Sequence, residues 1–117
     1  MADAETTVGE LIAEVRRFQK ERDWKQYHSP KNLAMGLAIE TGELLEHFQW
    51  VSEQASREVI GDEKAMAEIR DELADVLCYV LNLALELEVD LSEAFRAKMR
   101  KNAVKYPAEK YRGKYKL

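Results

Sequence analysis

The sequence predicts an all-α protein built like a four-helix bundle. Apolar residues recur every three or four positions over long stretches, which is the period of an amphipathic helix. Alternating polar and apolar runs and hairpin dipeptides such as Asn-Gly do not occur in the sequence, so no strands are expected. Only five Gly and two Pro interrupt 117 residues, of which 46% are hydrophobic. That content suits a single core, so we expect one domain over residues 1–109 and a basic tail over residues 110–117.

Each predicted helix begins at a residue that can cap it. The caps are the capping boxes Thr7-x-x-Glu10 and Asp90-x-x-Glu93, Ser29 followed by Pro30 at the first helical position, and Asp62 after Gly61. The helices are expected to span about residues 8–23, 30–52, 62–88 and 91–106, with a short helical piece at 53–60. Tyr106-Pro107 ends the last one, because a proline disfavours helical geometry at the residue before it. The short connections allow neighbouring helices to run antiparallel.

Two pairs of carboxylates, Glu40-x-x-Glu43 and Glu72-x-x-Asp75, lie inside the two most apolar helical stretches. Residues three apart share one face of a helix. On a helical wheel with Leu33 at zero, Glu40 falls at about 340°, within the apolar stripe, and Glu43 falls at its edge near 280°. Burying such a cluster without compensation costs several kcal/mol per ion. A hard divalent cation prefers oxygen ligands and removes that penalty, so the pairs predict a metal site.

Chance is the alternative explanation for these spacings. A chain with 34% charged residues contains Glu-x-x-Glu and Glu-x-x-Asp on solvated helix faces without any function. Either pair alone fits that interpretation about equally well. Two pairs on apolar faces of one small chain favour the metal site.

Positive charge is concentrated at the C-terminal end of the chain. Residues 98–117 contain eight Lys or Arg and one Glu, whereas the whole chain has a formal net charge of −4. Lys98, Asn102 and Lys105 follow at helical spacing on the face that also holds Phe95, and such side chains suit phosphate oxygens. For residues 110–116 we favour the other interpretation, a solvated basic tail that can touch nucleic acid or an acidic partner.

A carboxylate metal site with basic residues facing it is typical of phosphate-ester or anhydride hydrolysis. In that chemistry the metal neutralises phosphate charge and a bound water is the nucleophile. Trp24, Trp50 and Tyr79 lie close in sequence to the acidic helices and offer surfaces on which a base can stack. Each of them taken alone is more often part of a core. Together with the metal site, they predict a nucleotide substrate.

These residues resemble a known family. The two acidic pairs, with 28 residues between them, are similar to the metal motif of the all-α nucleoside triphosphate pyrophosphohydrolases, the MazG-like superfamily. Over about residues 7–107 the chain is also similar to the dCTP-pyrophosphatase-like branch of that superfamily. The similar segments are Arg22-Asp23-Trp24, His28-x-Pro30-Lys31-Asn32-Leu33, Gly42-Glu43-Leu44, Phe48-Gln49-Trp50, Glu72-Leu73-x-Asp75-Val76-Leu77-x-Tyr79 and Tyr106-Pro107.

The resemblance implies a Mg²⁺-dependent enzyme, with Mn²⁺ as a substitute, that converts nucleoside triphosphates to monophosphate and pyrophosphate. The favoured substrate is dCTP or modified dCTP, and the biological use is sanitation of the nucleotide pool. The implied site residues are Glu40, Glu43, Glu72 and Asp75 as magnesium ligands, His28, Trp24, Trp50 and Tyr79 around the nucleoside, and Lys98, Asn102, Lys105 and Tyr106 near the phosphates and sugar. Glu43 is our hypothesis for the group that activates water, with Glu40 beside it.

The resemblance also indicates a branch of the superfamily and a homo-oligomeric state. Many MazG proteins carry a further Glu just before the first motif residue, whereas Ile39 stands here, which fits the dCTP-pyrophosphatase-like branch. The family implies homo-oligomers, either dimers or tetramers. The sequence agrees, because the helix at 73–87 is apolar over more of its circumference than a four-helix monomer covers.

Three other kinds of protein could also be built from amphipathic helices with acidic pairs and a basic tail. A di-iron carboxylate bundle needs Glu-x-x-His pairs, which the two histidines, His28 and His47, do not form. A non-catalytic helical interaction module explains the amphipathic helices and the basic tail, but not charge within an apolar stripe. A nucleic-acid-binding bundle would rely on the tail and predicts salt-dependent affinity that survives loss of Glu40, and we expect no nucleic acid partner.

Location is predicted from what the sequence does not contain. No apolar run reaches transmembrane length, and the N-terminus lacks the basic and apolar regions of a signal peptide. We therefore expect a cytoplasmic protein with no membrane partner. The single cysteine, Cys78, is expected to be a small buried hydrophobe.

Overall fold

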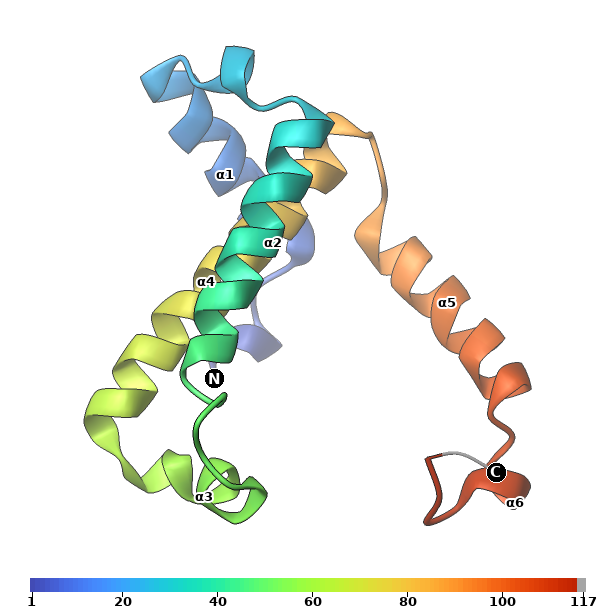
Figure 1. The fold of residues 1–117 in the computed structure, drawn as a ribbon. Coiled ribbons are helices and arrows are strands. Elements are labelled where there is room, and N and C mark those ends of the chain that lie inside the picture. The colour runs from blue at the N-terminus through green and yellow to red at the C-terminus, as the bar shows by residue number, and fades with distance from the viewer. Residues whose placement is uncertain (116–117) are drawn as a thin grey trace.

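The computed structural model describes residues 1–115, and within that range the chain is helical without any strand. Residues 116–117, the end of the expected basic tail, lie outside the described residues. The helices are η1 (Ala2–Ala4), α1 (Val8–Arg22), η2 (Lys25–Tyr27), α2 (Pro30–Glu46), α3 (Glu53–Glu58), η3 (Val59–Gly61), α4 (Glu63–Glu86), α5 (Leu91–Lys105) and α6 (Ala108–Tyr111) (Figure 1). The predicted all-α class is confirmed.

The predicted caps set where the long helices begin. The side-chain oxygens of Thr7, Ser29, Asp62 and Asp90 each accept a hydrogen bond from the backbone N–H three residues later, at 2.9–3.1 Å. Each bond satisfies a backbone donor that has no partner inside the helix, and such a cap is worth about 1 kcal/mol. Local sequence therefore fixes these four boundaries.

The end of α2 differs from the prediction, because the helix stops at Glu46 and not near Ser52. The backbone N–H groups of His47 and Phe48 bond to carbonyls three residues back, at 3.2 and 2.9 Å, which tightens the chain out of the α-helix. Ser52 is then available to cap α3, where its hydroxyl accepts from the N–H of Ala55 at 3.0 Å.

The packed part of the molecule is formed by α1, α2 and α4. Helix α2 runs antiparallel to α4 along its length, and α1 packs on α4 (Figure 1). Among residues 1–115 the buried hydrophobic residues are few: Leu33, Ile69, Leu81 and Ala84. Helix α4 contributes three of these four residues, and the two acidic pairs lie on α2 and α4.

Two helices end in left-handed residues that redirect the chain. Asp23, after α1, has φ 52°, and the N–H of Trp24 bonds to the carbonyl of Gln19 at 3.0 Å. Glu88, after α4, has φ 54°, and the next residue makes the equivalent bond at 2.9 Å. Both are Schellman caps without a glycine. The first directs the loop that carries Trp24, and the second directs α5.

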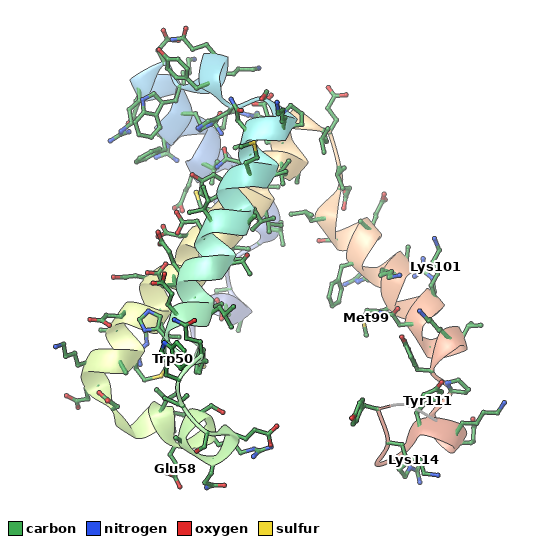
Figure 2. All side chains as sticks on the ribbon, in the orientation of Figure 1. Trp50, Glu58, Met99, Lys101, Tyr111 and Lys114 are labelled. Atoms are coloured by element: carbon green, nitrogen blue, oxygen red, sulfur yellow. The ribbon has the colours of Figure 1, made fainter. Side chains whose placement is uncertain are left out.

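Helix α5 stands apart from the rest of the chain. It packs extensively against no other element of residues 1–115, and Figure 1 shows a wide separation from α2 and α4. Figure 2 shows Met99 and Lys101 of α5 clear of those helices. The Phe95 side chain is 67% exposed. The fourth long helix is therefore present, but it does not close a bundle within one chain.

None of the described helices combines the length and the apolar character that a bilayer span requires.

Candidate metal and nucleotide site

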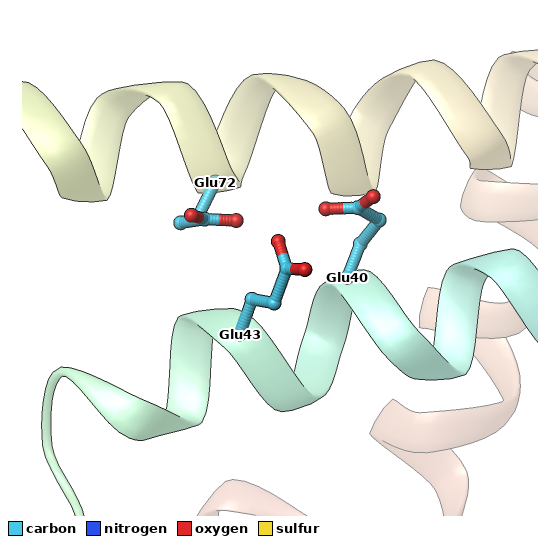
Figure 3. A group of neighbouring side chains, drawn as sticks. All are labelled: Glu40, Glu43 and Glu72. Carbon is cyan, nitrogen blue, oxygen red and sulfur yellow. The ribbon is translucent and has the colours of Figure 1, made fainter.

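Three carboxylates face one another between α2 and α4. Glu40 and Glu43 come from α2 and Glu72 comes from α4, and one oxygen of each lies within 4.8 Å of the other two. Figure 3 shows Glu43 extending into the space between Glu40 and Glu72. The three-residue spacing on α2 and the antiparallel packing of α4 produce this acidic cluster.

The acidic cluster is short of positive charge. Burial raises the pKa of Glu40, and a hydrogen bond to Glu43 and the charges of Glu43, Asp75 and Glu72 raise it further. Burial and Glu43 likewise raise the pKa of Glu72, which the nearby His47 lowers. In residues 1–115 no lysine or arginine forms a salt bridge with the cluster. The Oε2 atoms of Glu40 and Glu72 are buried without a hydrogen-bond partner from the described residues.

The donor set of the cluster consists of carboxylate oxygens alone. Hard cations such as Mg²⁺, Mn²⁺ and Ca²⁺ prefer such oxygens, whereas zinc sites usually include cysteine or histidine. Asp75 is exposed and lies one turn beyond Glu72 on α4, outside the group of three. Its charge nevertheless acts on Glu40. Its role as a fourth ligand stays a prediction.

A cavity of about 420 Å³ is bordered by Asp75 and Tyr79, which both lie close enough to Glu40 of the acidic cluster to interact with it electrostatically. Its walls come from α1, the loop after α1, and α4. They are formed by Glu14, Val15, Phe18, Gln19, Trp24, His28, Asp75, Cys78, Tyr79 and Asn82. A volume of this size, with apolar walls and a few polar groups, is typical of a small-molecule site.

An aromatic wall lines the α1 side of this cavity. The rings of Phe18 and Trp24 meet edge to face with centroids 5.6 Å apart, and Trp24 and His28 do so at 6.3 Å. The guanidinium of Arg22 lies 3.7 Å from the centroid of the Phe18 ring. These contacts hold Trp24 in place after the left-handed turn at Asp23.

Tyr79 forms the wall on the α4 side and packs against α2. A Cβ atom at Gly36 would lie 2.7 Å from Cζ of Tyr79, so only glycine admits this ring position. Burial and the charge of Glu40 raise the pKa of Tyr79, so its phenol stays protonated near neutral pH. Gly36 thus sets how closely the Tyr79 ring approaches α2.

Comparison with known proteins identifies the group to which this chain belongs. The MazG-like family is matched over residues 36–116, which include both acidic pairs and Tyr79. The chain belongs to the MazG-like family. This membership agrees with the resemblance seen in the two acidic motifs.

Individual relatives of this MazG-like chain carry pyrophosphatase names. The protein named dCTP pyrophosphatase 1 from Mus musculus is 41% identical over 106 residues, covering 87% of this chain and 62% of the mouse protein. That of Homo sapiens is 40% identical over 101 residues, covering 83% and 59%. The chain thus spans less than two thirds of the length of these curated relatives. A solved pyrophosphatase from Archaeoglobus fulgidus is 45% identical with a TM-score of 0.78, covering 85% of this chain and 91% of that one.

The MazG-like fold gathers some of the predicted site residues and not others. Trp24, His28 and Tyr79 line the cavity beside the acidic cluster. Trp50 lies in the turn after α2, is 88% exposed and does not line the cavity. The predicted phosphate and sugar residues lie at or just beyond the C-terminal half of α5, apart from the cluster within one chain: Lys98, Asn102, Lys105 and Tyr106. Binding roles for Trp50 and for these four residues stay predictions.

The cavity also contains residues that the sequence did not single out as functional. Gln19 and Asn82 are buried polar residues in its wall. Asn82 interrupts an apolar helix, which was a usable signal, but nothing in the sequence pairs it with Gln19. The expectation for Cys78 was wrong, because this residue is exposed and borders the cavity. Partial burial and the charge of Asp75 raise the pKa of its thiol, which leaves it protonated and weakly nucleophilic.

A larger hollow of about 730 Å³ lies between α1 and the end of α4. It is bordered by charged side chains of both signs, Arg16, Lys20, Lys25, Asp23, Glu86 and Glu88. Neither the acidic cluster nor Asp75 borders this hollow, whereas Asp75 borders the smaller cavity, so we take the smaller cavity as the candidate nucleotide site.

Proposed function

We propose that this chain is a Mg²⁺-dependent nucleoside triphosphate pyrophosphohydrolase that converts dCTP or modified dCTP to the monophosphate and pyrophosphate. The observation that carries the proposal is the acidic cluster of Glu40, Glu43 and Glu72 beside an aromatic cavity large enough for a nucleoside. The pyrophosphatase names of the relatives support the same reaction.

The residues of the cluster fit a divalent cation. Glu40 and Glu72 each bury an oxygen that has no hydrogen-bond partner among residues 1–115, and a cation would supply one. Glu43 offers a third oxygen within 4.8 Å, and Asp75 is the proposed fourth ligand. Mg²⁺ is the proposed ion, and Mn²⁺ shares its preference for carboxylate ligands. When bound, the cation supplies charge neutralisation for the triphosphate and lowers the pKa of the attacking water.

The reaction breaks one phosphoanhydride bond. The oxygen of water attacks the α-phosphorus, the bond from that phosphorus to the bridging oxygen breaks, and pyrophosphate leaves with the electron pair. The proposed acceptor of the water's proton is Glu43, which lies between the other two carboxylates. Trp24 and Tyr79 hold the nucleoside at the edge of the cluster, so that the triphosphate extends over the carboxylates.

Assembly is the second part of the proposal: the protein functions as a homo-oligomer. The chain has a radius of gyration of 17.3 Å, where a compact chain of this length would have about 13 Å. Its accessible surface is 9788 Å², against about 6,500 Å² for a compact monomer of 13.5 kDa. Exposed apolar residues lie on α4 and α5, including Leu73, Leu77, Phe95 and Met99. Such surface is what subunit contacts cover.

The same assembly gives the basic residues of α5 a role. The acidic cluster receives no lysine or arginine from its own chain within residues 1–115, although a triphosphate needs cationic partners. Lys98, Asn102 and Lys105 share one face of an unpacked helix. In an oligomer, α5 of one protomer can bring these side chains to the triphosphate site of a neighbour.

The test is product analysis with each dNTP and NTP. Wild-type protein and Glu40→Ala are incubated with and without Mg²⁺, and monophosphate, diphosphate, pyrophosphate and orthophosphate are resolved. We expect Mg²⁺-dependent monophosphate and pyrophosphate that the variant does not produce. Diphosphate with orthophosphate would show that a different bond is cut. Absence of any turnover would refute the proposed enzyme activity.

A further inference from the structure

Two buried amides lie in the wall of the nucleotide cavity. Gln19 of α1 is 4% exposed and Asn82 of α4 is 5% exposed, and they are the buried polar residues of the part of the chain that the structure describes. Both line the same cavity of about 420 Å³. Helices α1 and α4 pack against each other here, so the amides come from two different walls.

The orientation of the Asn82 amide is fixed by its own helix. Its Nδ2 donates a hydrogen bond to the backbone carbonyl of Cys78 at 3.0 Å and lies 3.6 Å from Sγ of that residue. Rotating the amide by half a turn would place Oδ1 against the carbonyl oxygen, acceptor against acceptor. Oδ1 is therefore the free atom, and it is a hydrogen-bond acceptor.

The second amide supplies the complementary group. Nε2 of Gln19 is a donor, it is buried, and within residues 1–115 it has no hydrogen-bond partner. Oδ1 of Asn82 is likewise buried and has no hydrogen-bond partner within residues 1–115. Buried polar groups in folded proteins are almost always paired, so an unpaired donor and an unpaired acceptor on two residues that line one cavity point to a ligand that pairs with both.

We propose that Gln19 and Asn82 recognise the hydrogen-bonding edge of cytosine and give the site its preference for cytosine over thymine and uracil. This inference rests on the proposed function, which supplies a nucleotide in the cavity. Cytosine carries a single donor group on that edge, its 4-amino group, so the amino group is the partner for Oδ1 of Asn82. The neighbouring ring nitrogen and the 2-carbonyl are acceptors, and Nε2 of Gln19 donates to one of them.

The same arrangement rejects thymine and uracil. These bases carry a carbonyl oxygen where cytosine carries its amino group. In the cytosine position that oxygen would face Oδ1 of Asn82, and neither atom has a hydrogen to share. Sites that hydrogen-bond a substrate group discriminate strongly against an analogue without it, because their own buried polar atoms are left unpaired. Aromatic contacts with Trp24 and Tyr79 accept any base, so they cannot make this distinction.

His28 does not decide between the bases. Its Nδ1 is also buried and unpartnered within the described residues, and it borders the same cavity. A neutral imidazole nitrogen is a donor in one tautomer and an acceptor in the other. It can therefore pair with either kind of base, whereas Asn82 cannot.

The competing explanation is structural. Gln19 and Asn82 could serve only to hold α1 against α4, with no contact to a nucleotide. The two explanations differ in what substitution changes. A structural pair alters thermal stability and leaves the ratio of affinities for two bases unchanged, whereas a recognising pair alters that ratio.

The experiment measures binding of dCMP and dTMP by calorimetry, which needs neither turnover nor metal. The wild-type protein is compared with Asn82→Ala, Gln19→Met and the control Gln26→Met, which changes an exposed amide outside the cavity. We expect the wild type and the control to bind dCMP at least tenfold more tightly than dTMP. In Asn82→Ala the preference falls to about threefold or less, and Gln19→Met weakens dCMP binding about tenfold.

A second variant covers the case in which Asn82→Ala does not fold. Asn82→Ser keeps a hydrogen bond to the carbonyl of Cys78 through its hydroxyl, but its shorter side chain leaves no acceptor at the position of Oδ1. We expect the same loss of preference. A wild type without preference, or variants that lower the melting temperature but keep the ratio of dCMP to dTMP affinity, would overturn the inference. Loss of turnover with an intact dCMP preference would refute the proposed reaction alone.

Discussion

Replacing Gly36 with alanine tests how Tyr79 is seated. In the middle of α2, alanine would by itself stabilise the helix by about 1 kcal/mol relative to glycine. Here the added Cβ would lie 2.7 Å from Cζ and 3.0 Å from Cδ1 of the Tyr79 ring, whereas carbon atoms in contact are about 3.5–4.0 Å apart. The ring must shift by about 1 Å. Overpacking of this kind costs about 1–3 kcal/mol, which leaves a net loss of about 1 kcal/mol.

Gly42→Ala is the matched control because it lies on the same helix. A Cβ atom at Gly42 would meet nothing within 4 Å. The gain in helix propensity is the same as at Gly36, without the clash, so we expect this variant to be more stable by about 1 kcal/mol. The two variants should therefore differ by about 2 kcal/mol, or roughly 8 °C in melting temperature.

The assay is thermal unfolding at one protein concentration, without nucleotide or metal, followed by kinetics with dCTP. Displacement of the Tyr79 ring narrows the cavity, so Gly36→Ala should raise the KM for dCTP about tenfold, while Gly42→Ala leaves it unchanged. Equal melting shifts in the two variants, with an unchanged KM in both, would refute the packing of Tyr79 against Gly36.

Three further outcomes are expected. The pKa values of Glu40 and Glu72 are raised above the ordinary value of 4.5. Between 4.5 and the raised values, the folded metal-free protein therefore binds more protons than the unfolded chain, and its stability falls as the pH rises through this range. The melting temperature measured with chelator should therefore decline from pH 4.5 to 8, and the increase in melting temperature on adding Mg²⁺ should become larger. A melting temperature that rises with pH in the presence of chelator would contradict this. Glu43→Gln should lower kcat at least 100-fold while Glu46→Gln, on another face of α2, stays near wild type, and full turnover by Glu43→Gln would exclude it as the proton acceptor. Phe95→Glu on α5 should elute as a smaller species than wild type in size-exclusion chromatography. Elution of the wild type at the volume expected for a monomer of 13.5 kDa would refute the oligomer.

The acidic cluster could be predicted from the sequence because it depends mainly on local residue spacing. The three-residue spacing of Glu40 and Glu43 places both on one helix face whatever the tertiary fold, and their position within an apolar stripe predicts a packed neighbour. The chain then returns through α3 and η3 into an antiparallel α4, which brings Glu72 opposite. The helix caps were accessible for the same reason, since each depends on four consecutive residues.

The pairing of the Gln19 and Asn82 amides and the position of α5 could not be predicted in this way. Whether Gln19 faces Asn82 depends on how α1 rotates about its axis when it packs on α4, and helix periodicity leaves that rotation open within the width of the apolar stripe. The end of α2 was misplaced because hydrogen bonds to the third residue back compete closely with α-helical bonds at helix ends. Periodicity predicts that α5 is a helix, but it does not say which surface the helix covers.

The left-handed cap at Glu88 ends α4 and sends α5 away from the core. In the proposed homo-oligomer this helix gains its support from a neighbouring copy, so the stability of the fold depends on protein concentration through mass action. In a cell, dilution would then lower both stability and activity together, without any inhibitor. The concentration of the protein would itself control the activity of the proposed homo-oligomer.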